Sequence, residues 1–402
     1  MRQDGKLKEL LLRSEKMGVP AIDCIVFRKG KCIFRHQSGY SDEARTKPVD
    51  GSERYNIYSC SKLITCVAAL QLVEQGKLGL DDPVYEYLPE FRHLQKKCGE
   101  GADPVAASLI VQNLFAMQGN LAHNAAAPNQ PDSLPKQGDD RLEPVTTTMT
   151  VRHLFTMTAG LTYNVASPNL LRGMAETKGR LPTREAMKYL AKDPLIFEPG
   201  ENWCYSLCHD VLAAIVEVVS GQRFGSFVKA RIFDPLGMSQ STFLLPEEEL
   251  GSITAQYRYH EDTKAFVPCG PEVQLCKLGT EYESGGGGCI STVDEYIRFL
   301  EAMRTGEQLL KRETIAEMTR PQISGEAQRV FERPGYSYGL GVRCPKPGFG
   351  THDYGWGGAA GAFLAIIPDA ETTLFHVQHV LSSPNRSLRM SFVAALLDDL
   401  QG

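Results

Sequence analysis

The most regular pattern of apolar positions in the chain follows residue 62. Leu63, Val67 and Leu70 recur at the spacing of one helical face, and further apolar residues form a second stripe beside them. No proline interrupts the pattern, and Gly76 is a natural stop. Because the apolar stripe is so wide, we expect a helix that is buried on most of its sides.

Apolar and β-branched residues near both ends of the chain predict strands instead. Near the N-terminus, residues 21–27 and 31–37 form two such runs, joined by a tight turn at residues 28–30. Near the C-terminus, β-rich composition marks three further segments, Tyr338–Arg343, Gly361–Ile367 and Thr372–Val380. Helical patterns surround and separate these strands, at residues 6–16, 210–219, 224–233, 294–304 and 387–400.

Strands at both ends and helices in the middle predict an α+β fold. We expect one antiparallel sheet that is built from both termini and flanked by helices, with a mostly helical lobe inserted between its two parts. The expected sheet domain comprises residues 1–75 and 285–402, and the helical lobe comprises residues 76–284.

Within the lobe, residues 98–148 differ from their surroundings because they are rich in Gly, Ala, Pro, Asn and Gln. One apolar island, Leu109–Met117, interrupts them. A loop of this length is compatible with a surface loop that contains a short helix, and equally with a lid or a subunit contact. Both interpretations stay open, and so does a homo-oligomer.

Composition narrows the possible partners. The chain has 402 residues, 42% of them hydrophobic, which is enough for a large core. Its net charge of -5 and its pI of about 6.0 favour neither nucleic acid nor an anionic membrane. Residues 1–9 lack the apolar core of a signal peptide, and no apolar run is long enough to span a bilayer. Eleven cysteines, an odd number, then indicate reduced thiols in a cytoplasmic protein.

Several ligand-binding and catalytic patterns do not occur in the sequence. There is no Cys-x-x-Cys and no His-Glu-x-x-His, and His376 and His379 lie in an expected strand, where they would point to opposite faces. Residues 285–288 are four glycines without the Lys-Ser/Thr that follows in a P-loop. No Gly-x-Ser-x-Gly elbow occurs either. We therefore expect neither a metal nor another cofactor.

Three Ser-x-x-Lys pairs are candidates for catalysis: Ser59/Lys62, Ser133/Lys136 and Ser226/Lys229. The second pair lies in a proline-rich loop, and the third lies in an expected amphipathic helix, where a lysine is ordinarily a solvated charge. Only the first pair has a strand-like approach and a buried helix behind it. Residues three apart share a helical face, so a neutral Lys62 could take the proton of Ser59. The unpaired N–H groups of that first turn would stabilise negative charge beside the serine.

The order of four segments resembles that of the serine β-lactamase and penicillin-binding-protein-like hydrolases, in particular the class C-like branch that includes the family VIII carboxylesterases. The resemblance covers roughly residues 20–400. The segments that carry it are Ile57-Tyr58-Ser59-Cys60-Ser61-Lys62, residues 151–161, residues 198–207 with Tyr205-Ser206-Leu207, and Tyr354-Gly355-Trp356-Gly357-Gly358-Ala359. The resemblance implies the fold described above and acyl transfer at Ser59.

The resemblance also implies partners for the serine. Tyr205 would act with Lys62, taking the proton of Ser59 and later passing it to the leaving group. The backbone N–H groups of Ser59 and Ala359 would form an oxyanion hole. On the residues alone, Tyr205 could also be a core tyrosine whose hydroxyl caps a loop.

Two departures from the family pattern bear on the substrate. Leu207 stands where the second motif has an asparagine, whose amide grips the acylamino side chain of β-lactams and peptides. Trp356, followed by Gly357 and Gly358, stands where the third motif has a cation that recognises a carboxylate. We expect these four residues to line an apolar substrate wall, which favours uncharged esters.

The resulting prediction is a serine carboxylesterase that acts on small-molecule esters through an acyl-enzyme. Three alternatives stay open. The chain could be an acyltransferase that passes the acyl group to an alcohol, an amidase similar to β-lactamases or D-aminopeptidases, or a non-catalytic binding protein on the same fold.

Overall fold

The computed structural model describes residues 5–98, 141–270 and 277–401, except for Glu307, Glu332, Thr351 and the side chain of Met390. Most of the segment 98–148, including Leu109–Met117, therefore lies outside the described residues.

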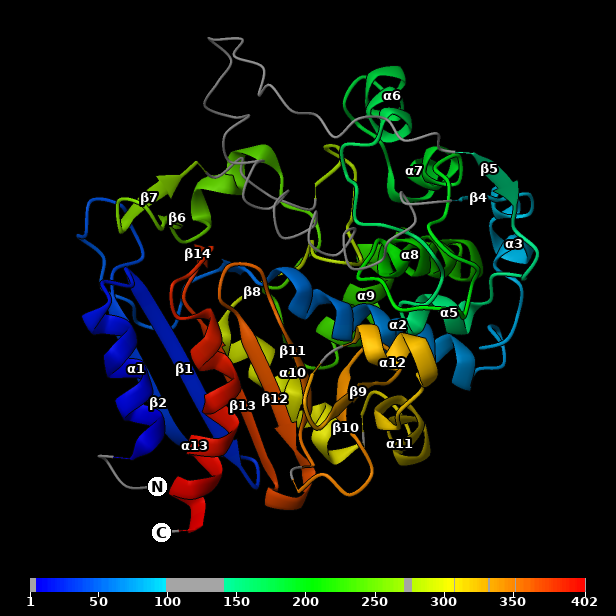
Figure 1. Cartoon of the computed structure of the whole chain (residues 1–402). Coiled ribbons are helices and arrows are strands. Elements are labelled where there is room, and N and C mark those ends of the chain that lie inside the picture. Colours follow the sequence, from blue (N-terminus) through cyan, green and yellow to red (C-terminus); the bar gives the residue numbers. More distant parts are fainter. Residues whose placement is uncertain are drawn as a thin grey trace.

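A seven-stranded antiparallel sheet forms the centre of the molecule, and its strands come from both ends of the chain (Figure 1). In spatial order the strands are β2 (Lys31–Gly39), β1 (Ala21–Arg28), β13 (Thr372–Val377), β12 (Phe363–Ile367), β11 (Tyr354–Gly357), β10 (Arg343–Pro345) and β9 (Tyr336–Tyr338). The N-terminal hairpin joins the C-terminal strands through β1 and β13, where Ile25 lies opposite Phe375. The predicted sheet built from both termini is thereby confirmed.

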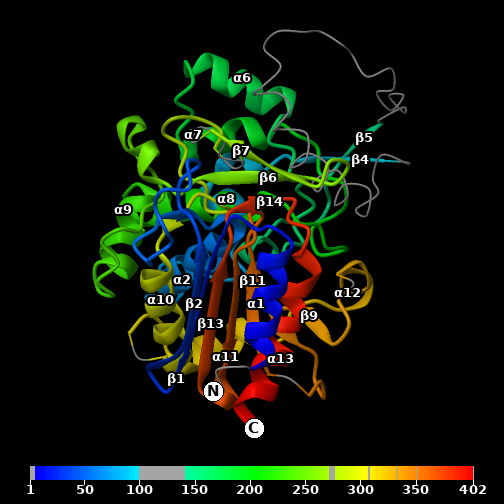
Figure 2. The same cartoon turned by 90° about the vertical axis from the view of Figure 1, so that its left-hand side faces the viewer.

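Helices cover both faces of this sheet (Figure 2). The covering helices are α1 (Lys6–Lys16) and α13 (Arg389–Gln401) on one face and α10 (Val293–Thr305) on the other, while α2 (Ser61–Glu74) packs against the helical lobe. In β1, Ile22, Cys24 and Val26 belong to the apolar layer of α1 and α13, whereas Ile25 belongs to the large core that includes α10, which contacts β1. Because both faces are covered, β1 is a nearly continuous apolar run and not an alternating one.

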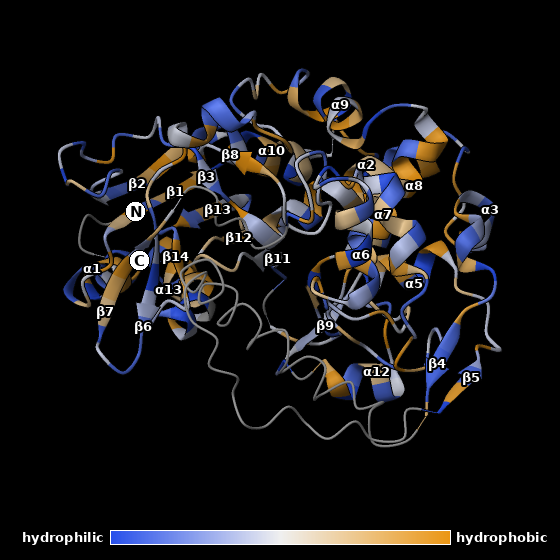
Figure 3. Cartoon of the chain, turned by 90° about the horizontal axis from the view of Figure 1, so that it is seen from above, coloured by the Kyte–Doolittle hydropathy of each residue, from blue (hydrophilic) through white to orange (hydrophobic). Residues whose placement is uncertain are grey.

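The middle of the chain supplies a helical lobe on the side of the molecule away from β2 (Figures 1 and 3). Its helices are α3 (Val84–Tyr87), α5 (Val151–Phe155), α6 (Pro168–Glu176), α7 (Thr183–Leu190), α8 (Cys208–Ser220) and α9 (Phe224–Val228). α2 packs against α8, and the two helices share one apolar core. The division into domains at residues 76 and 284 stays a proposal.

Smaller elements complete the described structure. They are the pairs β3 (Tyr55–Asn56) with β8 (Ile290–Ser291) and β4 (Gln95–Lys97) with β5 (Leu142–Pro144), the sheet of β14 (Val380–Leu381), β6 (Gln256–His260) and β7 (Ala265–Cys269), and the helices α11 (Arg312–Thr319) and α12 (Gly325–Val330). Among the described residues, no single helix is long and apolar enough to cross a membrane. The bent pair Cys208–Ser220 and Phe224–Phe233 is long and apolar enough only when its two helices are taken together.

Three predicted elements are wrong in their extent. The segment Tyr338–Arg343 is not one strand, because a turn separates β9 from β10, and Gly341 in that turn has a φ of +85°. The segment 224–233 is not one α-helix, because α9 passes into a π-helical turn at Lys229–Phe233. Thr372–Val380 divides into β13 and β14, and His379 before β14 has a φ of +48°.

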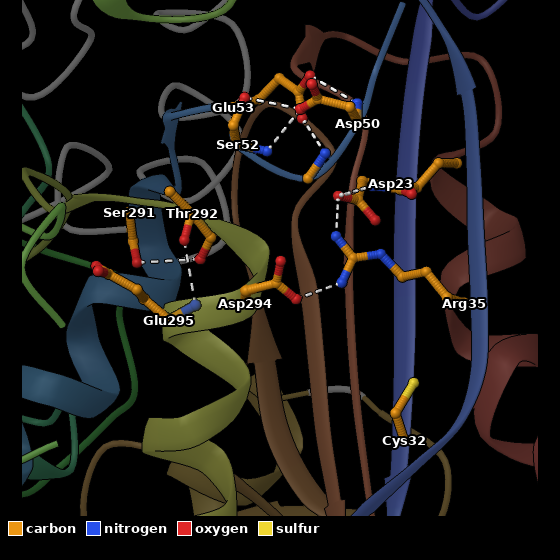
Figure 4. A network of polar contacts seen from close by, with 12 residues as sticks. Asp23, Cys32, Arg35, Asp50, Ser52, Glu53, Ser291, Thr292, Asp294 and Glu295 are labelled. Carbon is orange, nitrogen blue, oxygen red and sulfur yellow. Dashed lines mark hydrogen bonds and ion pairs between the residues drawn. The ribbon is translucent and has the colours of Figure 1, made fainter. Parts of the chain in front are cut away.

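A partly buried polar network ties the N-terminal hairpin to α10 (Figure 4). Arg35 on β2 donates to Asp23 on β1 at 2.6 Å and to Asp294 in the first turn of α10 at 2.5 Å. Burial raises the pKa of Asp23 to about 7, although Arg35 opposes this shift. The helix α10 follows its N-cap residue Thr292, whose hydroxyl accepts from the N–H of Glu295 at 3.1 Å.

Candidate active site

Ser59 lies in a tight turn that leads into α2. A 3₁₀ turn, Tyr58–Cys60, precedes the helix, and Tyr58 has a φ of +47°, which is uncommon for a residue with a side chain. The Tyr58 hydroxyl donates to Gln256 at 2.6 Å, and its carbonyl accepts from the Ser61 hydroxyl at 2.5 Å. These buried contacts hold the strained turn that presents Ser59.

Lys62 follows in the first turn of α2, and its side chain is fully buried. Its Nζ atom donates to the carbonyl oxygen of Gly286 at 2.6 Å. The same atom lies 3.4 Å from Ser59 Oγ and 3.4 Å from the hydroxyl of Tyr163. The expected proximity of Ser59 and Lys62 is therefore present in the structure.

Tyr205 reaches the same serine from the loop before α8. Its hydroxyl donates to Ser59 Oγ at 2.5 Å, and the indole N–H of Trp356 donates to that hydroxyl at 3.4 Å. The Tyr205 ring stacks between Tyr163 and Trp356, with ring centroids 5.4 Å and 5.8 Å away. Lys62 Nζ lies 4.6 Å from the centre of the Tyr205 ring. Tyr205 is thus fixed on both faces, with its hydroxyl directed at Ser59.

The loop between β11 and β12 lies against the turn that carries Ser59. A side chain added at Gly358 would come within 2.3 Å of the carbonyl oxygen of Ile57, which shows how closely the two backbones approach. Arg389 of α13 donates to the carbonyl of Gly358 at 2.9 Å and holds the loop from the other side. Ala359 is the next residue and is partly buried. Its role in an oxyanion hole stays a proposal.

The expected substrate-binding residues differ in their surroundings. Trp356 is 6% exposed and contacts Tyr205, whereas Gly357 is partly buried. Leu207 is 2% exposed and packs into the core where α8 begins. The structure therefore brings Trp356 into contact with Tyr205, whereas Leu207 packs into the core.

The other Ser-x-x-Lys pairs have no comparable surroundings. Ser226 is exposed on α9, and Lys229 forms a surface ion pair with Asp234, as expected of a solvated charge. Ser133 and Lys136 lie outside the described residues.

Three groups around Lys62 were not predicted from the sequence: Tyr163, Gly286 and Asp210. Asp210 is fully buried in the first turn of α8, where its Oδ1 atom accepts from Tyr282 at 2.9 Å and from Ser284 at 2.7 Å. Burial raises the pKa of Asp210, and the nearby positive charge of Lys62 opposes the rise. In the sequence, Gly286 was marked only by the glycine run that contains it, and Tyr163 only by its position just after a motif-like segment. No sequence signal marked Asp210.

No group of three or more His, Cys, Asp or Glu side chains in the described part of the chain could hold a metal ion. His376 and His379 are both buried, and this burial lowers the pKa of His376 to about 3 and that of His379 to about 4. The cysteines of the described part carry free thiols.

Known proteins share both the sequence pattern and the fold of this chain. Residues 12–390 match the Beta-lactamase family. Esterase EstB of Burkholderia gladioli is 27% identical over 361 residues, which cover 84% of this chain and 78% of the relative. The human mitochondrial serine beta-lactamase-like protein LACTB is 25% identical over 407 residues, which cover 90% of this chain and 71% of the relative.

Two solved structures show the same fold over nearly their whole length. EstCE1, a hydrolase with promiscuous acyltransferase activity, has a TM-score of 0.73 at 22% identity and covers 99% of this chain and 98% of its own. Simvastatin synthase LovD from Aspergillus terreus has a TM-score of 0.75 at 20% identity, with 98% of each chain covered. Since the family match spans almost the entire sequence and includes the Ser59 turn, Tyr205 and the loop after β11, this protein belongs to the Beta-lactamase family.

Proposed function

We propose that this protein is a serine hydrolase that cleaves small carboxylic esters through an acyl-enzyme on Ser59. The proposal rests above all on the 2.5 Å hydrogen bond between Tyr205 and Ser59 Oγ, next to the buried Nζ of Lys62. A serine hydroxyl becomes a useful nucleophile only with a base in hydrogen-bond reach. The named activities of two similar proteins, Esterase EstB and the hydrolase EstCE1, support the same class of reaction.

The acylation step follows from these positions. Ser59 Oγ attacks the ester carbonyl carbon, and its proton passes to the phenolate form of Tyr205. Lys62, held by Gly286, places a positive charge beside that phenolate and stabilises it. The negative charge that develops on the carbonyl oxygen would be held by the backbone N–H groups of Ser59 and Ala359.

The remaining steps reverse the proton's path. When the bond between the carbonyl carbon and the alcohol oxygen breaks, Tyr205 returns the proton to that oxygen, and the alcohol leaves. A water molecule then attacks the ester bond to Ser59, with Tyr205 again taking and returning one proton. The acid is released, and both side chains return to their starting state.

Esters are favoured over β-lactams and acylated peptides because of the second motif. Leu207 has no amide with which to bind an acylamino side chain, and its side chain is buried in the core. The amide that would grip an acylamino side chain is therefore missing, while Ser59, Lys62 and Tyr205, the residues proposed for acylation, are retained.

Acyl transfer to an alcohol is the second candidate. ML-236A carboxylate methylbutanoyltransferase mlcH of Penicillium citrinum is 26% identical over 324 residues, which cover 78% of this chain and 67% of the relative. The same acyl-enzyme on Ser59 would then meet an alcohol and not water. An assay that follows both acid and new ester in the presence of an added alcohol separates the two outcomes.

The test begins with a fluorophosphonate probe, which labels activated serines. We expect labelling of the wild-type protein and of Ser226→Ala, a matched control at an exposed serine of α9, and no labelling of Ser59→Ala. A series of p-nitrophenyl esters with increasing acyl length, with nitrocefin alongside, then defines the substrate. Equal labelling of Ser59→Ala and wild type would refute the proposal, and nitrocefin turnover as efficient as that of p-nitrophenyl butyrate would favour the amidase alternative.

A further inference from the structure

An arginine from a segment outside the motifs reaches the site. Arg333 lies between α12 and β9, and its guanidinium carbon is 4.8 Å from the centre of the Trp356 ring and 5.4 Å from that of Phe331. These are cation–π distances. Trp356 in turn donates to the hydroxyl of Tyr205, which donates to Ser59. One indole therefore contacts both the guanidinium and the proposed proton carrier.

Among the residues that the structure describes, no acid balances the positive charge of Arg333. No carboxylate of the described residues lies within ion-pair distance of Arg333, which is an exposed residue. The nearby Arg343 already pairs with buried Asp353, and Arg386 adds a further positive charge. Although the residue as a whole is exposed, desolvation of its guanidinium against the rings lowers the pKa of Arg333 to about 10, so its side chain remains charged at neutral pH.

We propose that Arg333 binds a carboxylate on the alcohol portion of the ester substrate, a specificity that rests on the hydrolase function proposed above. A guanidinium that is fixed over an aromatic face and lacks an internal partner is suited to a carboxylate, which it can bind through two parallel hydrogen bonds. An acid of the protein at this place would have masked the charge.

The alcohol side follows from the position of Tyr205. In the proposed mechanism the acyl oxygen points to the N–H groups of Ser59 and Ala359, whereas Tyr205 hands its proton to the departing alcohol. Trp356 and Arg333 lie on the side of Tyr205 and interact with it. The sequence predicted a purely apolar substrate wall. In the proposal made here, that wall also carries a cation, Arg333, which comes from outside the third motif.

Two esters that differ in one charge test this binding. One is 5-acetoxy-2-nitrobenzoate, which has a carboxylate on its leaving group, and the other is the neutral amide, 5-acetoxy-2-nitrobenzamide. We expect the wild type to have a kcat/KM about tenfold higher for the carboxylate, as befits a charge-assisted contact that is partly open to solvent. Arg333→Gln should lower the ratio of the two kcat/KM values to about one, and Arg333→Lys should give an intermediate ratio.

Arg329→Gln is the matched control, because Arg329 is an exposed arginine of α12 that pairs with Glu326 on the surface. It should leave the ratio between the two esters unchanged. A ratio that Arg333→Gln leaves intact, or that Arg329→Gln lowers as much, overturns the proposal. Thermal midpoints measured by circular dichroism before the kinetics would show whether either variant is unfolded.

A binding measurement keeps this proposal separate from the hydrolase function. In a Ser59→Ala background, 5-hydroxy-2-nitrobenzoate should bind about tenfold more tightly than its amide by calorimetry, and Arg333→Gln should remove the difference. If the wild type cleaves neither ester but this preference is found, the hydrolase function fails and the carboxylate site stands. Equal binding of the two compounds overturns the carboxylate site, whatever the esterase activity.

Discussion

Replacing Gly286 by alanine tests whether the backbone behind Lys62 sets the reaction rate. The carbonyl oxygen of Gly286 accepts the hydrogen bond of Lys62 Nζ at 2.6 Å. A methyl group on Gly286 would lie 2.4 Å from Asp210 Oδ2, 3.0 Å from the Tyr163 hydroxyl and 3.3 Å from Lys62 Nζ. Because ordinary contacts begin at 3.4 Å, the nearest of these atoms would have to move by about 1 Å.

Asp210 cannot absorb this movement freely, since Tyr282 and Ser284 hold its other oxygen. We therefore expect the backbone at Gly286 to shift and to take Lys62 with it. A misplacement of about 1 Å at a catalytic group costs roughly a hundredfold in rate. Overpacking a core costs about 1–3 kcal/mol of stability, which a protein of this size can tolerate. The expected result is a folded protein with kcat lowered about a hundredfold.

The assay compares kcat for p-nitrophenyl butyrate, the rate of fluorophosphonate labelling and the thermal midpoint. Gly251→Ala is the control, because a methyl group there meets no atom within 4 Å. A folded Gly286→Ala variant with kcat within about twofold of the wild type would contradict this reasoning, given the expected effect of displacement. The double variant with Asp210→Ala provides a further check, since removing the obstructing carboxylate should make Gly286→Ala harmless to kcat relative to Asp210→Ala alone.

Three further predictions follow from the same contacts. Tyr205→Phe keeps the stacked ring but removes the hydroxyl that meets Ser59, so kcat should fall by several orders of magnitude while KM changes little, as steady-state kinetics would show. Asp210→Asn keeps an acceptor for Tyr282 and Ser284 but removes the carboxyl group that interacts electrostatically with Lys62; we expect a loss in kcat of about tenfold at an unchanged thermal midpoint, and full activity would exclude an electrostatic role. Burial raises the pKa of Asp23 from 3.8 to about 7, so between these pH values the folded protein holds a proton that the unfolded chain releases. The stability that this proton contributes therefore declines as the pH rises from about 4 to about 7. Urea titrations should show that the stability difference between wild type and Asp23→Asn changes across this range and is constant above it.

The features that the sequence predicted are those that depend on local spacing. Ser59 and Lys62 share a face because three residues separate them at the start of a helix, and the apolar run behind them is the buried α2. Strands were recognisable in both terminal regions because β1 and β13 are covered on both faces and are therefore rich in apolar residues. The sequence pattern and the structure agree for features that depend on the spacing of residues within one helix or strand.

The features that the sequence did not predict depend on which segments meet in space. Tyr163 and Gly286 lie far from Lys62 in the chain, yet both provide an oxygen atom for its Nζ. The periodicity of apolar residues within a segment does not predict contacts between segments that are distant in the sequence. The turn at Gly341 was missed for a different reason, because the β-rich residues on either side conceal a single glycine in the left-handed region.

The cation at the site illustrates the limit of motif-based reasoning most directly. The third motif of this chain has Trp356 in place of a lysine or histidine, which suggested a site without positive charge. The electrostatic potential at a site, however, is the sum over every group that comes near it, from any part of the chain. Here the indole that replaced the cation offers its face to the guanidinium of Arg333, which comes from the connection before β9. In the proposal above, the positive charge therefore comes from Arg333 and not from the motif, and the substrate class has to be inferred from the assembled site and not from the motif alone.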